Sequence, residues 1–588
     1  MPTRHSPLAH LPPATLWAET FVAALAQAGL RRVVIAPGSR STPLTLAFAR
    51  RTDIRRYTAI DERSAAFFAL GLALADGQPA ALVCTSGSAA AEFYPAILEA
   101  DAAEVPLLVL TADRPHELRH SGANQTTDQV KLYGDHVRWF VDVALPEPDP
   151  APRTRRALHT LAARALAAAQ GFHAPPGPVH LNFPFRKPLS PPPGVEMPGV
   201  GGSPLPEGEG LGVDGSPPPQ GEGLGVGVPT VPEFVRGILH PSEAQVRTLK
   251  ACIQENPRGL ILCGPRCPNG DFPQAVRALA QASGYPVLAE PLSGVRFGPH
   301  VDGHILGGYE HYLHTAPSPQ VVLRFGALPV GKGALTFLNS LPPETQVIHV
   351  SASGTWQDES HRLGLLLHAD PTLTCRALTE ALSTPRNAAS NCDDWLCAWR
   401  ALERAAWTGR SHWLPALLKA LPEAAKLFVA SSLSVRILGE TCPPDTAVRR
   451  VFANRGLSGI DGTIASAAGA AAASRRPTLL LIGDLAFLHD MNSLHLLRHV
   501  EAPFVILLLN NNGGGIFHRL PIAAHEPPFT ELFRMPHGMT FEHTARQFGL
   551  QYFGYAQDAP AETIVQTAAE AFSGTHPVLV EWMTDDGR

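Results

Sequence analysis

Short apolar runs alternate with longer, helix-like stretches over the first 189 residues of the chain. A helical pattern over 15–29 leads into the apolar run 33–35, and another over 65–75 leads into the run 80–84. Apolar runs of this length are typical of buried strands. Their regular alternation with helical stretches predicts parallel strand–helix units, and therefore an α/β fold.

Polar clusters follow these apolar runs directly, where each predicted strand ends. The clusters are Pro37–Arg40, Asp61–Arg63, Thr85–Ser88 and Thr111–Arg114. In parallel α/β sheets, ligands bind beyond the carboxyl ends of the strands. These four clusters are therefore the first candidates for a binding site.

The same pattern returns twice further along the chain. Three apolar runs between 260 and 350 predict a smaller α/β domain over 233–386. No G-x-G-x-x-G turn follows any of them, so a dinucleotide site in this domain is unsupported. Apolar runs over 478–482 and 504–509 predict a third α/β domain over 387–588.

A proline- and glycine-rich insert separates the first two predicted domains. Much of the excess of the 57 Pro and 51 Gly lies in 190–232, where the stretch 203–215 is imperfectly repeated in 216–228. Almost nothing in this insert could fill a core, so it is predicted to be a flexible linker or a surface insert. Recognition of its proline-rich segments by another protein is the alternative.

Composition and charge exclude several classes of protein. The 588 residues carry a formal net charge of −5, which removes the general electrostatic argument for a nucleic-acid binder. No apolar run approaches the ~18 residues needed to span a membrane, and the first residues contain no apolar core of signal-peptide length. The eight Cys include no C-x-x-C pair, which disfavours a zinc site and favours reduced thiols. A soluble, cytoplasmic protein is expected.

Two polar residues beyond the strands of the third domain indicate a cation site. Asp484 and Asn511 are 27 residues apart, about one strand–helix–strand crossover, and each follows a strong apolar run. Adjacent strands could therefore present both side chains to one point. Carboxylate, amide and carbonyl oxygens suit Mg²⁺, and a glycine at Gly513 lets the backbone approach closely. Taken alone, the stretch Asn510–Gly514 is most often just a turn.

This spacing resembles the diphosphate–Mg²⁺ signature of thiamine-diphosphate enzymes, although the chain reads GDL where GDG is usual. Further stretches in the same order resemble the SEPHCHC synthase (MenD) family of menaquinone biosynthesis. They are Ala36–Leu44, Asp61–Arg63, Thr85–Gly87, Thr111–Pro115, Ala123–Gln125, Asn454–Gly456, Ser458–Gly462 and Asn510–Phe517. The resemblance covers nearly the whole chain except the 190–232 insert.

The resemblance implies three doubly wound parallel-sheet α/β domains of the thiamine-diphosphate-enzyme type. They are an N-terminal pyrimidine-binding domain (1–189), a central α/β domain (233–386) and a C-terminal diphosphate- and Mg²⁺-binding domain (387–588). It also implies that Glu62 and Gln125 are catalytic, with Glu62 hydrogen-bonded to the aminopyrimidine ring of the cofactor. By itself, an acid at the position of Glu62 is also typical of a helix N-terminus.

The resemblance implies a cofactor site and a metal site. The cofactor-binding positions are Glu62, Thr85, Ser86, Gly87, Ile460, Asp484, Leu485, Asn511, Gly513, Gly514 and Ile516. The metal, Mg²⁺ with Mn²⁺ as an alternative, is expected on Asp484, Asn511 and the carbonyl of Gly513. Ile460 is expected to wedge the cofactor into a bent shape, and ordinary core packing of this residue would look the same in the sequence.

The implied reaction is decarboxylation of 2-oxoglutarate, followed by 1,4-addition of the resulting succinyl carbanion to isochorismate. Both substrates are dianions, and arginine recognises carboxylates through two hydrogen bonds. The matching positions are Ser39, Arg40, Arg114, Gln125, Lys332, Ser432, Arg436 and Arg455, with Ile516, Phe517 and Leu520 as an apolar wall. Surface ion pairs are the alternative for Arg40 and Arg114. Gly333 departs from relatives that carry a second cation there, which leaves substrate contacts from the central domain open.

The resemblance also implies an assembly, a homodimer or a homotetramer, because the N-terminal domain of one subunit faces the C-terminal domain of another in this superfamily. No histidine in the matched motifs stands beside Glu62 or the Asp484–Asn511 pair, so none is assigned to acid–base catalysis. Two rival functions stay open at this point. One is an acetohydroxyacid-synthase-like 2-oxoacid decarboxylase or carboligase, and the other is a non-catalytic binding protein with a dead cofactor site.

Overall fold

The structure is a computed structural model, and it describes residues 11–191, 231–383, 391–447 and 450–585. The chain divides into two compact units, the first made of Met1–Ala73 and Gly77–Val235 and the second of Arg236–Arg588 with the short stretch Leu74–Asp76. Most of the 190–232 insert, including its duplicated stretch, lies outside the described residues. Each unit is described below by itself.

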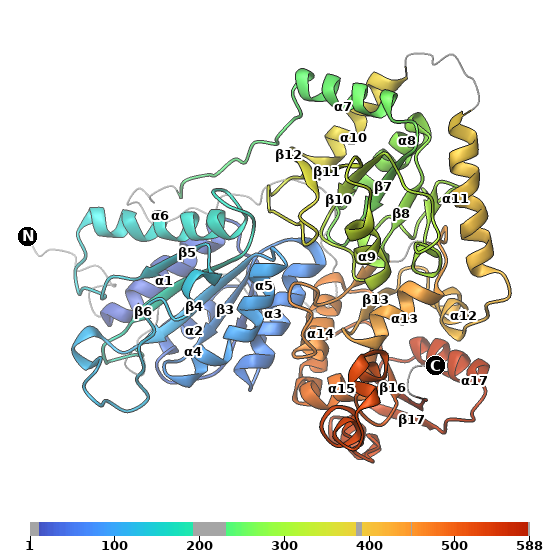
Figure 1. Cartoon of the computed structure of the whole chain (residues 1–588). Coiled ribbons are helices and arrows are strands. Elements are labelled where there is room, and N and C mark those ends of the chain that lie inside the picture. Colours follow the sequence, from blue (N-terminus) through green and yellow to red (C-terminus); the bar gives the residue numbers. More distant parts are fainter. Residues whose placement is uncertain (1–10, 192–230, 384–390, 448–449, 586–588) are drawn as a thin grey trace, which may run out of the picture. The chain divides into compact units, whose positions relative to one another are not determined.

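The first unit is built on one six-stranded parallel sheet in the order β2-β1-β3-β4-β6-β5 (Figure 1). Its strands are β1 (Arg32–Ile35), β2 (Arg55–Thr58), β3 (Ala80–Cys84), β4 (Leu107–Asp113), β5 (Trp139–Asp142) and β6 (Pro178–Pro184). Its α-helices are α1 (Pro13–Gln27), α2 (Thr42–Ala49), α3 (Glu62–Asp76), α4 (Ser88–Glu92), α5 (Tyr94–Ala102) and α6 (Pro152–Ala169). Apolar residues of α1, α2 and α6 share one core with β1, β3, β4 and β6, which follows from the burial of both faces of a parallel sheet.

The second unit contains two such sheets. The central sheet has the order β12-β11-β10-β7-β8-β9 and is parallel throughout. Its strands are β7 (Gly259–Cys263), β8 (Val287–Ala289), β9 (Ile305–Leu306), β10 (Val321–Phe325), β11 (Gln346–Ser351) and β12 (Leu363–His368). Its helices are α7 (Glu243–Glu255), α8 (Phe272–Ser283), α9 (Lys332–Ser340) and α10 (Pro371–Leu382).

Read from β9, the central sheet has the strand order 3-2-1-4-5-6 that is common among dinucleotide-binding domains. The point where that order reverses, between β7 and β10, is filled by backbone. Ala327 N donates to Pro265 O at 2.7 Å, and a Cβ on Gly264 would lie 1.9 Å from Ala327 O. The two loops after β7 and β10 therefore contact each other where a dinucleotide would bind, which agrees with the lack of a G-x-G-x-x-G turn after β7.

The remaining sheet of the second unit has the order β14-β13-β15-β16-β18-β17, again parallel throughout. Its strands are β13 (Lys426–Val429), β14 (Arg450–Phe452), β15 (Thr478–Gly483), β16 (Phe504–Asn510), β17 (Gln551–Tyr555) and β18 (Val578–Met583). Its helices are α12 (Trp413–Ala420), α13 (Leu433–Thr441), α14 (Thr463–Ser474), α15 (Asp484–Asp490), α16 (Glu542–Gln547) and α17 (Ala561–Glu570). This order repeats that of the first unit, strand for strand.

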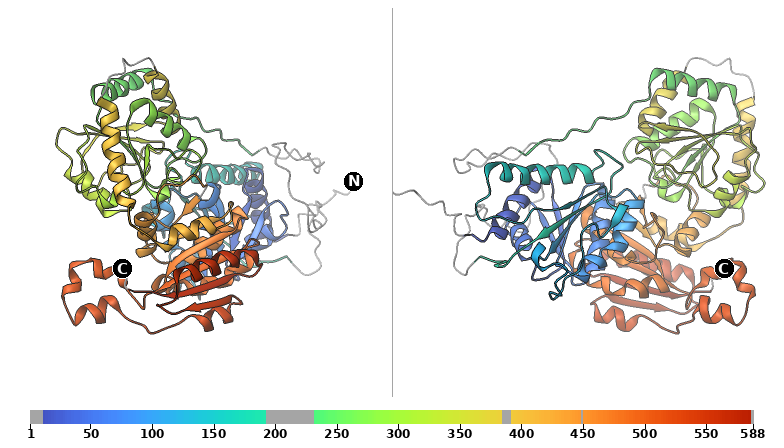
Figure 2. Two further views of the ribbon diagram at one scale, coloured as in Figure 1. Left: turned by 90° about the vertical axis from the view of Figure 1, so that its right-hand side faces the viewer. Right: turned by 60° about the vertical axis from the view of Figure 1, so that its left-hand side comes forward.

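Helix α11 (Asn391–Trp407) lies in the segment that the sequence assigns to the C-terminal domain, yet it packs on the central sheet. Trp395 and Trp399 join the apolar residues of β7 and β10 in one core, and Trp395 Nε1 donates to Gly259 O at 2.8 Å. The domain boundary at 386/387 stays a prediction. The prediction of three parallel α/β domains is confirmed, with helices on both sides of each sheet (Figures 1 and 2).

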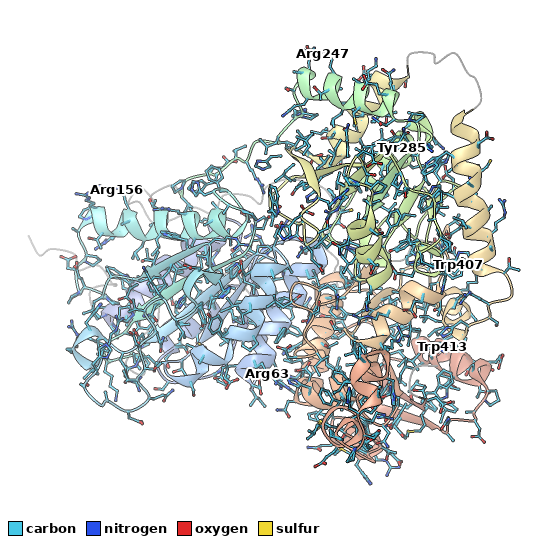
Figure 3. All side chains as sticks on the ribbon, viewed as in Figure 1. Arg63, Arg156, Arg247, Tyr285, Trp407 and Trp413 are labelled. Atoms are coloured by element: carbon cyan, nitrogen blue, oxygen red, sulfur yellow. The ribbon has the colours of Figure 1, made fainter. Side chains whose placement is uncertain are left out.

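Charged side chains lie at the surface and a large aromatic side chain lies in the interior, as expected for a folded chain (Figure 3). Arg156 on α6 and Arg247 on α7 project outward, whereas Tyr285 lies inside the central domain. The hydroxyl of this buried tyrosine donates to Asn256 O at 2.5 Å, so its polar end is satisfied. No helix in the described part of the chain is long and apolar enough to cross a membrane.

Candidate active site

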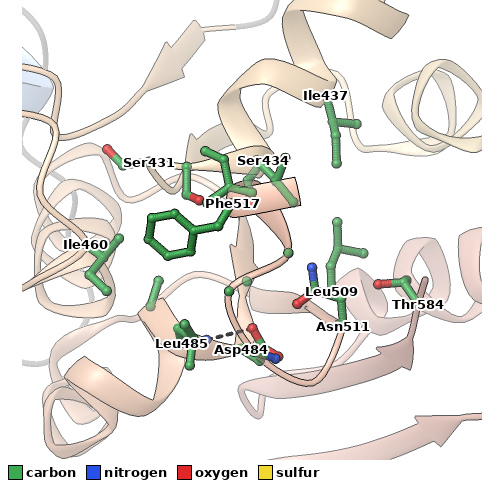
Figure 4. A pocket seen from close by; sticks show the side chains of 18 of the residues that line it. Ser431, Ser434, Ile437, Ile460, Asp484, Leu485, Leu509, Asn511, Phe517 and Thr584 are labelled. Carbon is green, nitrogen blue, oxygen red and sulfur yellow. Dashed lines mark hydrogen bonds between the residues drawn. The ribbon is translucent and has the colours of Figure 1, made fainter. Parts of the chain in front are cut away.

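A pocket of about 170 Å³ opens at the carboxyl edge of the β13–β18 sheet (Figure 4). Its lining combines Asp484, Asn511 and glycines with hydroxyls and apolar side chains. The lining residues are Ser431, Ser432, Leu433, Ser434, Ile437, Ile460, Gly483, Asp484, Leu485, Ala486, Leu509, Asn511, Gly513, Gly514, Gly515, Ile516, Phe517, Thr584 and Asp585. All of the sequence-predicted cofactor positions of the second unit are among them.

The sheet itself brings Asp484 and Asn511 together. Strands β15 and β16 are adjacent and parallel, and Gly483 at the end of β15 is in register with Leu509. Asp484 begins α15, and Asn511 follows the last residue of β16. The expectation that neighbouring strand ends present these two side chains at one edge is confirmed.

Asp484 is 3% exposed, and its carboxylate is held by three donors. Oδ1 accepts from Leu485 N at 2.8 Å, and Oδ2 accepts from Gly513 N at 2.7 Å. His537 Nε2 lies 3.0 Å from the same Oδ2. A buried carboxylate fixed by three hydrogen bonds has one orientation, as a metal ligand needs.

The side-chain oxygen of Asn511 is buried and has no hydrogen-bond partner among the described residues. A buried amide oxygen without a partner costs free energy, so this atom is available to a ligand from outside the described residues. Gly513 adopts a φ of +129°, and a Cβ there would lie 2.2 Å from Arg534 O. The turn therefore needs glycine, and the oxygen donors around it fit a hard cation such as Mg²⁺.

This donor set differs from a cluster of charged or sulfur ligands. Within the described residues, no group of three or more His, Cys, Asp or Glu side chains is placed to hold a metal ion. The candidate set instead combines one carboxylate with amide and backbone oxygens, as Mg²⁺ accepts when its remaining ligands are water and phosphate.

The opposite side of the pocket is formed by the N-terminus of α13 and by apolar side chains. Ser432 precedes this helix with a φ of +73°, which is rare for a residue with a Cβ and is typical of functional sites. Phe517 points towards Ile460 across the pocket (Figure 4). Sequence reasoning named these three residues but missed the neighbouring Ser431, Leu433, Ser434, Ile437, Leu509, Thr584 and Asp585.

Four other sequence-predicted residues of the second unit do not line this pocket. Arg436 Nη1 donates to the backbone carbonyl Ser432 O at 2.6 Å, and Arg455 Nη1 donates to the hydroxyl Ser431 Oγ at 3.3 Å, so both guanidinium groups contact residues that line the pocket. Leu520 is 47% exposed.

Lys332, the fourth of them, is exposed at the first residue of α9. Beside it, the Glu310 carboxylate accepts from Gly333 N at 2.9 Å and Ala334 N at 3.1 Å. Two backbone N–H groups at the N-terminus of this helix, which have no partner within the helix, are thus already bonded to a carboxylate of the same unit.

In the first unit, Glu62 is the first residue of α3 and is partly buried. Asp61 caps the helix by accepting from Ser64 N at 2.8 Å, so the cap is not Glu62 itself. Burial raises the pKa of the Glu62 carboxyl, and the charges of Asp61 and Glu92 raise it further. A carboxyl that keeps its proton more readily than usual suits a group that shares a proton with a ligand.

The loops after β3 and β4 are tied together by the predicted residues. Ser86 Oγ donates to Gln125 O at 3.0 Å, and Gln125 Nε2 donates to Ser86 O at 2.9 Å. Arg114 Nη1 donates to Ser86 Oγ at 3.1 Å, and Gly87 N donates to Gln129 Oε1 at 3.0 Å. Sequence reasoning missed Gln129, whose fully buried amide joins these loops.

Arg40 is 6% exposed, and its Nε has no hydrogen-bond partner among the described residues. Nη1 donates to Phe185 O at 2.7 Å, and its backbone N–H donates to Thr85 Oγ1 at 3.2 Å, whereas Ser39 is exposed. Burial lowers the pKa of Arg40, and the nearby charge of Arg114 lowers it further. The Arg114 guanidinium donates to Asn124 O and Ser86 Oγ, so neither guanidinium group bonds a carboxylate within the described ranges, although the charge of Asp113 raises the pKa of Arg40. This contradicts the surface ion-pair alternative, and the two positive charges suit an anionic ligand.

One histidine in contact with the site was missed by sequence reasoning. The sequence places His537 53 residues beyond Asp484 and outside every matched motif, yet its ring contacts the Asp484 carboxylate. No local pattern signals this contact, because the segment that carries His537 is irregular.

Comparisons with known proteins agree with this geometry. Residues 17–132 match the family model of the thiamine pyrophosphate enzyme, N-terminal TPP binding domain, and residues 440–582 match that of the C-terminal TPP binding domain. A 2-succinyl-5-enolpyruvyl-6-hydroxy-3-cyclohexene-1-carboxylate synthase of Roseiflexus sp. is 46% identical over 97% of this chain and 95% of its own length. The protein of that name from Haloquadratum walsbyi is 41% identical over 97% of this chain and 95% of its own length.

A solved structure shows the same fold. The thiamine diphosphate-dependent 4-hydroxybenzoylformate decarboxylase of Rhodococcus jostii RHA1 is similar with a TM-score of 0.69, covering 97% of this chain and 99% of its own. Its sequence is 17% identical, so the likeness concerns the fold.

Proposed function

Because the chain belongs to the family of 2-succinyl-5-enolpyruvyl-6-hydroxy-3-cyclohexene-1-carboxylate (SEPHCHC) synthases, thiamine-pyrophosphate-dependent enzymes, we propose that it joins 2-oxoglutarate to isochorismate. In this reaction 2-oxoglutarate loses CO₂, and the remaining four-carbon unit adds to the isochorismate ring in a 1,4-addition. The product is SEPHCHC, an intermediate of menaquinone biosynthesis. The observation that carries this proposal is the 46% identity over 97% of the chain.

Thiamine diphosphate, when bound, supplies the nucleophilic carbon and the electron sink that the decarboxylation requires. Glu62 is proposed to hold or release a proton at its carboxylate beside the aminopyrimidine of the cofactor. Partial burial supports this role, because it raises the pKa of the Glu62 carboxyl above that of an ordinary exposed glutamate. Gln125, tied to Ser86 by two hydrogen bonds, is proposed to orient the reacting groups.

Asp484, Asn511 and the carbonyl of Gly513 are the proposed metal ligands, with Leu485, Gly514, Ile460 and Ile516 beside the cofactor and Thr85, Ser86 and Gly87 on the first unit. Mg²⁺ is the proposed ion, and Mn²⁺ also accepts an oxygen-only set. The partnerless Oδ1 of Asn511 supports this assignment. A bound cation would neutralise part of the diphosphate charge in the pocket.

The two dianionic substrates are proposed to bind to cations from both units. Arg40, Arg114 and Ser39 contribute from the first unit, where neither guanidinium group bonds a carboxylate in the described part of the chain. The second unit contributes polar groups and an apolar wall, from Lys332, Ser432, Arg436, Arg455, Ile516, Phe517 and Leu520. Phe517 and Ile460 give their side of the pocket an apolar lining, which is proposed to limit the access of water.

Three further assignments complete the proposal. The domains are 1–189 for the pyrimidine, 233–386 as the central domain and 387–588 for the diphosphate and metal. The chain is proposed to assemble as a homodimer or homotetramer in the cytoplasm, with no nucleic-acid partner. The net charge of −5 supports the last point.

A two-substrate assay tests the proposed reaction. The purified chain is incubated with 2-oxoglutarate, isochorismate, thiamine diphosphate and Mg²⁺. We expect equal consumption of both substrates with release of CO₂, and no comparable turnover when isochorismate is omitted. Turnover of pyruvate alone, without a product from the proposed pair, would replace this function by that of an acetohydroxyacid-synthase-like enzyme.

A further inference from the structure

Residues 534–539, here called the strap, lie directly against the 510–515 turn that carries the proposed metal ligands. The strap begins at the last residue of a short π-helix (Thr530–Arg534) and precedes α16. Seven hydrogen bonds connect the strap with the turn or with Asp484. These bonds fix a segment without regular structure against the turn, which fits a positioning role.

Arg534 fixes the backbone of the turn. Its guanidinium donates to Asn512 O and, at 2.5 Å, to Asn511 O, and its own carbonyl accepts from Gly514 N at 2.7 Å. Two adjacent carbonyls are thereby held by one planar group, which restricts the rotation of the peptides on either side. The peptide between Asn512 and Gly513, and hence the turn beside the proposed Gly513 ligand, is constrained.

The asparagine side chains of the turn fix the strap in return. Asn512 Oδ1 accepts from His537 N at 2.9 Å and from Gly538 N at 2.6 Å. Asn510 Nδ2 donates to Met539 O at 3.0 Å. The strap and the turn are therefore one hydrogen-bonded unit, and His537 has a single backbone position within it.

The ring of His537 has one defined tautomer. Nδ1 accepts from Met539 N at 3.0 Å, so the hydrogen of the neutral ring is on Nε2. Nε2 lies 3.0 Å from Asp484 Oδ2, and both side chains are less than a tenth exposed. His537 therefore donates a buried hydrogen bond to the proposed metal ligand.

This bond leaves the two carboxylate oxygens of Asp484 unequal. Oδ2 already accepts from Gly513 N and His537, whereas Oδ1 accepts only from Leu485 N among the described residues. The less occupied oxygen is the one with lone-pair capacity for a cation. We infer that His537 is a positioning residue of the cation site, which fixes Asp484 by its Nε2–H and leaves Oδ1 for Mg²⁺.

The inference rests on the proposed cofactor site, and its test measures binding in the absence of substrate. Mg²⁺ is titrated calorimetrically into the full chain with excess thiamine diphosphate. His537→Ala should raise the apparent Kd for Mg²⁺ by about tenfold or more, the usual effect of losing a partner of a metal ligand. His537→Gln, which retains an N–H donor, should stay within about threefold of the wild type.

Two further variants separate the hydrogen bond from packing. His537→Phe keeps a ring of similar shape without the donor and should lose as much affinity as His537→Ala. His543→Ala, an exposed histidine on α16, is the matched control and should bind Mg²⁺ as the wild type does. Melting temperatures without metal should agree within about 2 °C for all four variants, because one hydrogen bond in a loop contributes little to the stability of a large domain.

The outcomes are distinct. Normal Mg²⁺ affinity in His537→Ala or His537→Phe would overturn the inference while leaving the proposed function intact. Equal losses in His537→Gln and His537→Ala would also overturn it, because the donor would then be irrelevant. A wild-type chain that bound no Mg²⁺ with thiamine diphosphate would overturn the cofactor assignment and this inference together.

Discussion

Glu62 is a partly buried acid whose position, rather than its type alone, makes it a candidate for proton transfer. Its neighbour Asp61 already caps α3, so the helix does not need a second acid at this point. We expect Glu62→Gln to lower kcat at least tenfold, about 1.4 kcal/mol in barrier height, because an amide cannot exchange a proton with the cofactor ring. Steady-state assays with both substrates measure this change.

The control for Glu62 is the nearby exposed acid at the end of α4. Glu92→Gln removes a neighbouring charge that contributes to the raised pKa of Glu62, but it leaves the carboxyl in place. We expect kcat to stay within about twofold, since a screened surface charge has little effect. If Glu62→Gln and Glu92→Gln lower kcat equally, the activity depends on the local negative charge and not on a proton held by Glu62.

His180 provides a pH-dependent contribution to stability in the first unit. It is fully buried on β6, where burial lowers its pKa to about 3, and its Nε2 lies 2.8 Å from Thr111 Oγ1. The unfolded chain binds a proton here below about pH 6.5 and the folded chain does not, so stability is complete above that pH and is lost as the pH falls towards 3.

The size of this effect can be measured with a variant. Lowering the pH from 7 to 5 should reduce the free energy of unfolding of the wild type by about 2 kcal/mol through protonation of His180 in the unfolded chain. The His180→Gln variant should lack this contribution. The gap in unfolding free energy between the two proteins, measured in urea, should therefore narrow by that amount on acidification. A constant gap would mean that His180 binds a proton in the folded chain as readily as in the unfolded chain.

The 510–515 turn depends on close packing between its own residues. A Cβ on Gly515 would lie 2.1 Å from Asn511 Nδ2, and the atom it meets is the end of a flexible side chain. Gly515→Ala should therefore displace the Asn511 amide without unfolding the domain, and raise the apparent Kd for Mg²⁺ by about tenfold. Gly574→Ala, where the added Cβ makes only an ordinary 3.6 Å contact, is the control.

A result in which both glycine variants bind Mg²⁺ alike would show that the Asn511 side chain is not a ligand. The same titration with Mn²⁺ checks whether Gly515→Ala weakens the binding of both ions or of Mg²⁺ alone. Because both substitutions add one methyl group, a difference between them reports on position rather than on side-chain size.

The strands and their ends could be predicted from the sequence because parallel strands are buried on both faces and finish at a common edge. The Asp484–Asn511 pair and the Thr85–Gly87 loop were found in this way. His537 and Gln129 were not, because their contacts join segments that are distant in sequence and have no periodic pattern. The exposure of Lys332 and the burial of Arg40 also depend on tertiary packing, which local pattern does not encode.

The chain as a whole distributes its proposed chemistry over two compact units, with Glu62 in the first and Asp484 in the second. Family resemblance implies that a site combines the first unit of one subunit with the second unit of another. An assembly of this kind makes a distinct prediction for mixtures of inactive chains, because each subunit then contributes half of two different sites.

Co-expression of Glu62→Gln and Asp484→Asn chains tests this arrangement. If sites form between subunits of a homodimer, a mixed dimer has one site with both substitutions and one with neither. Random pairing makes about half of the dimers mixed, and half of their sites are intact, so about one quarter of wild-type activity should return. Each variant expressed alone should be nearly inactive. If both residues instead belonged to one chain, no pairing would create an intact site, and the mixture would stay as inactive as its components.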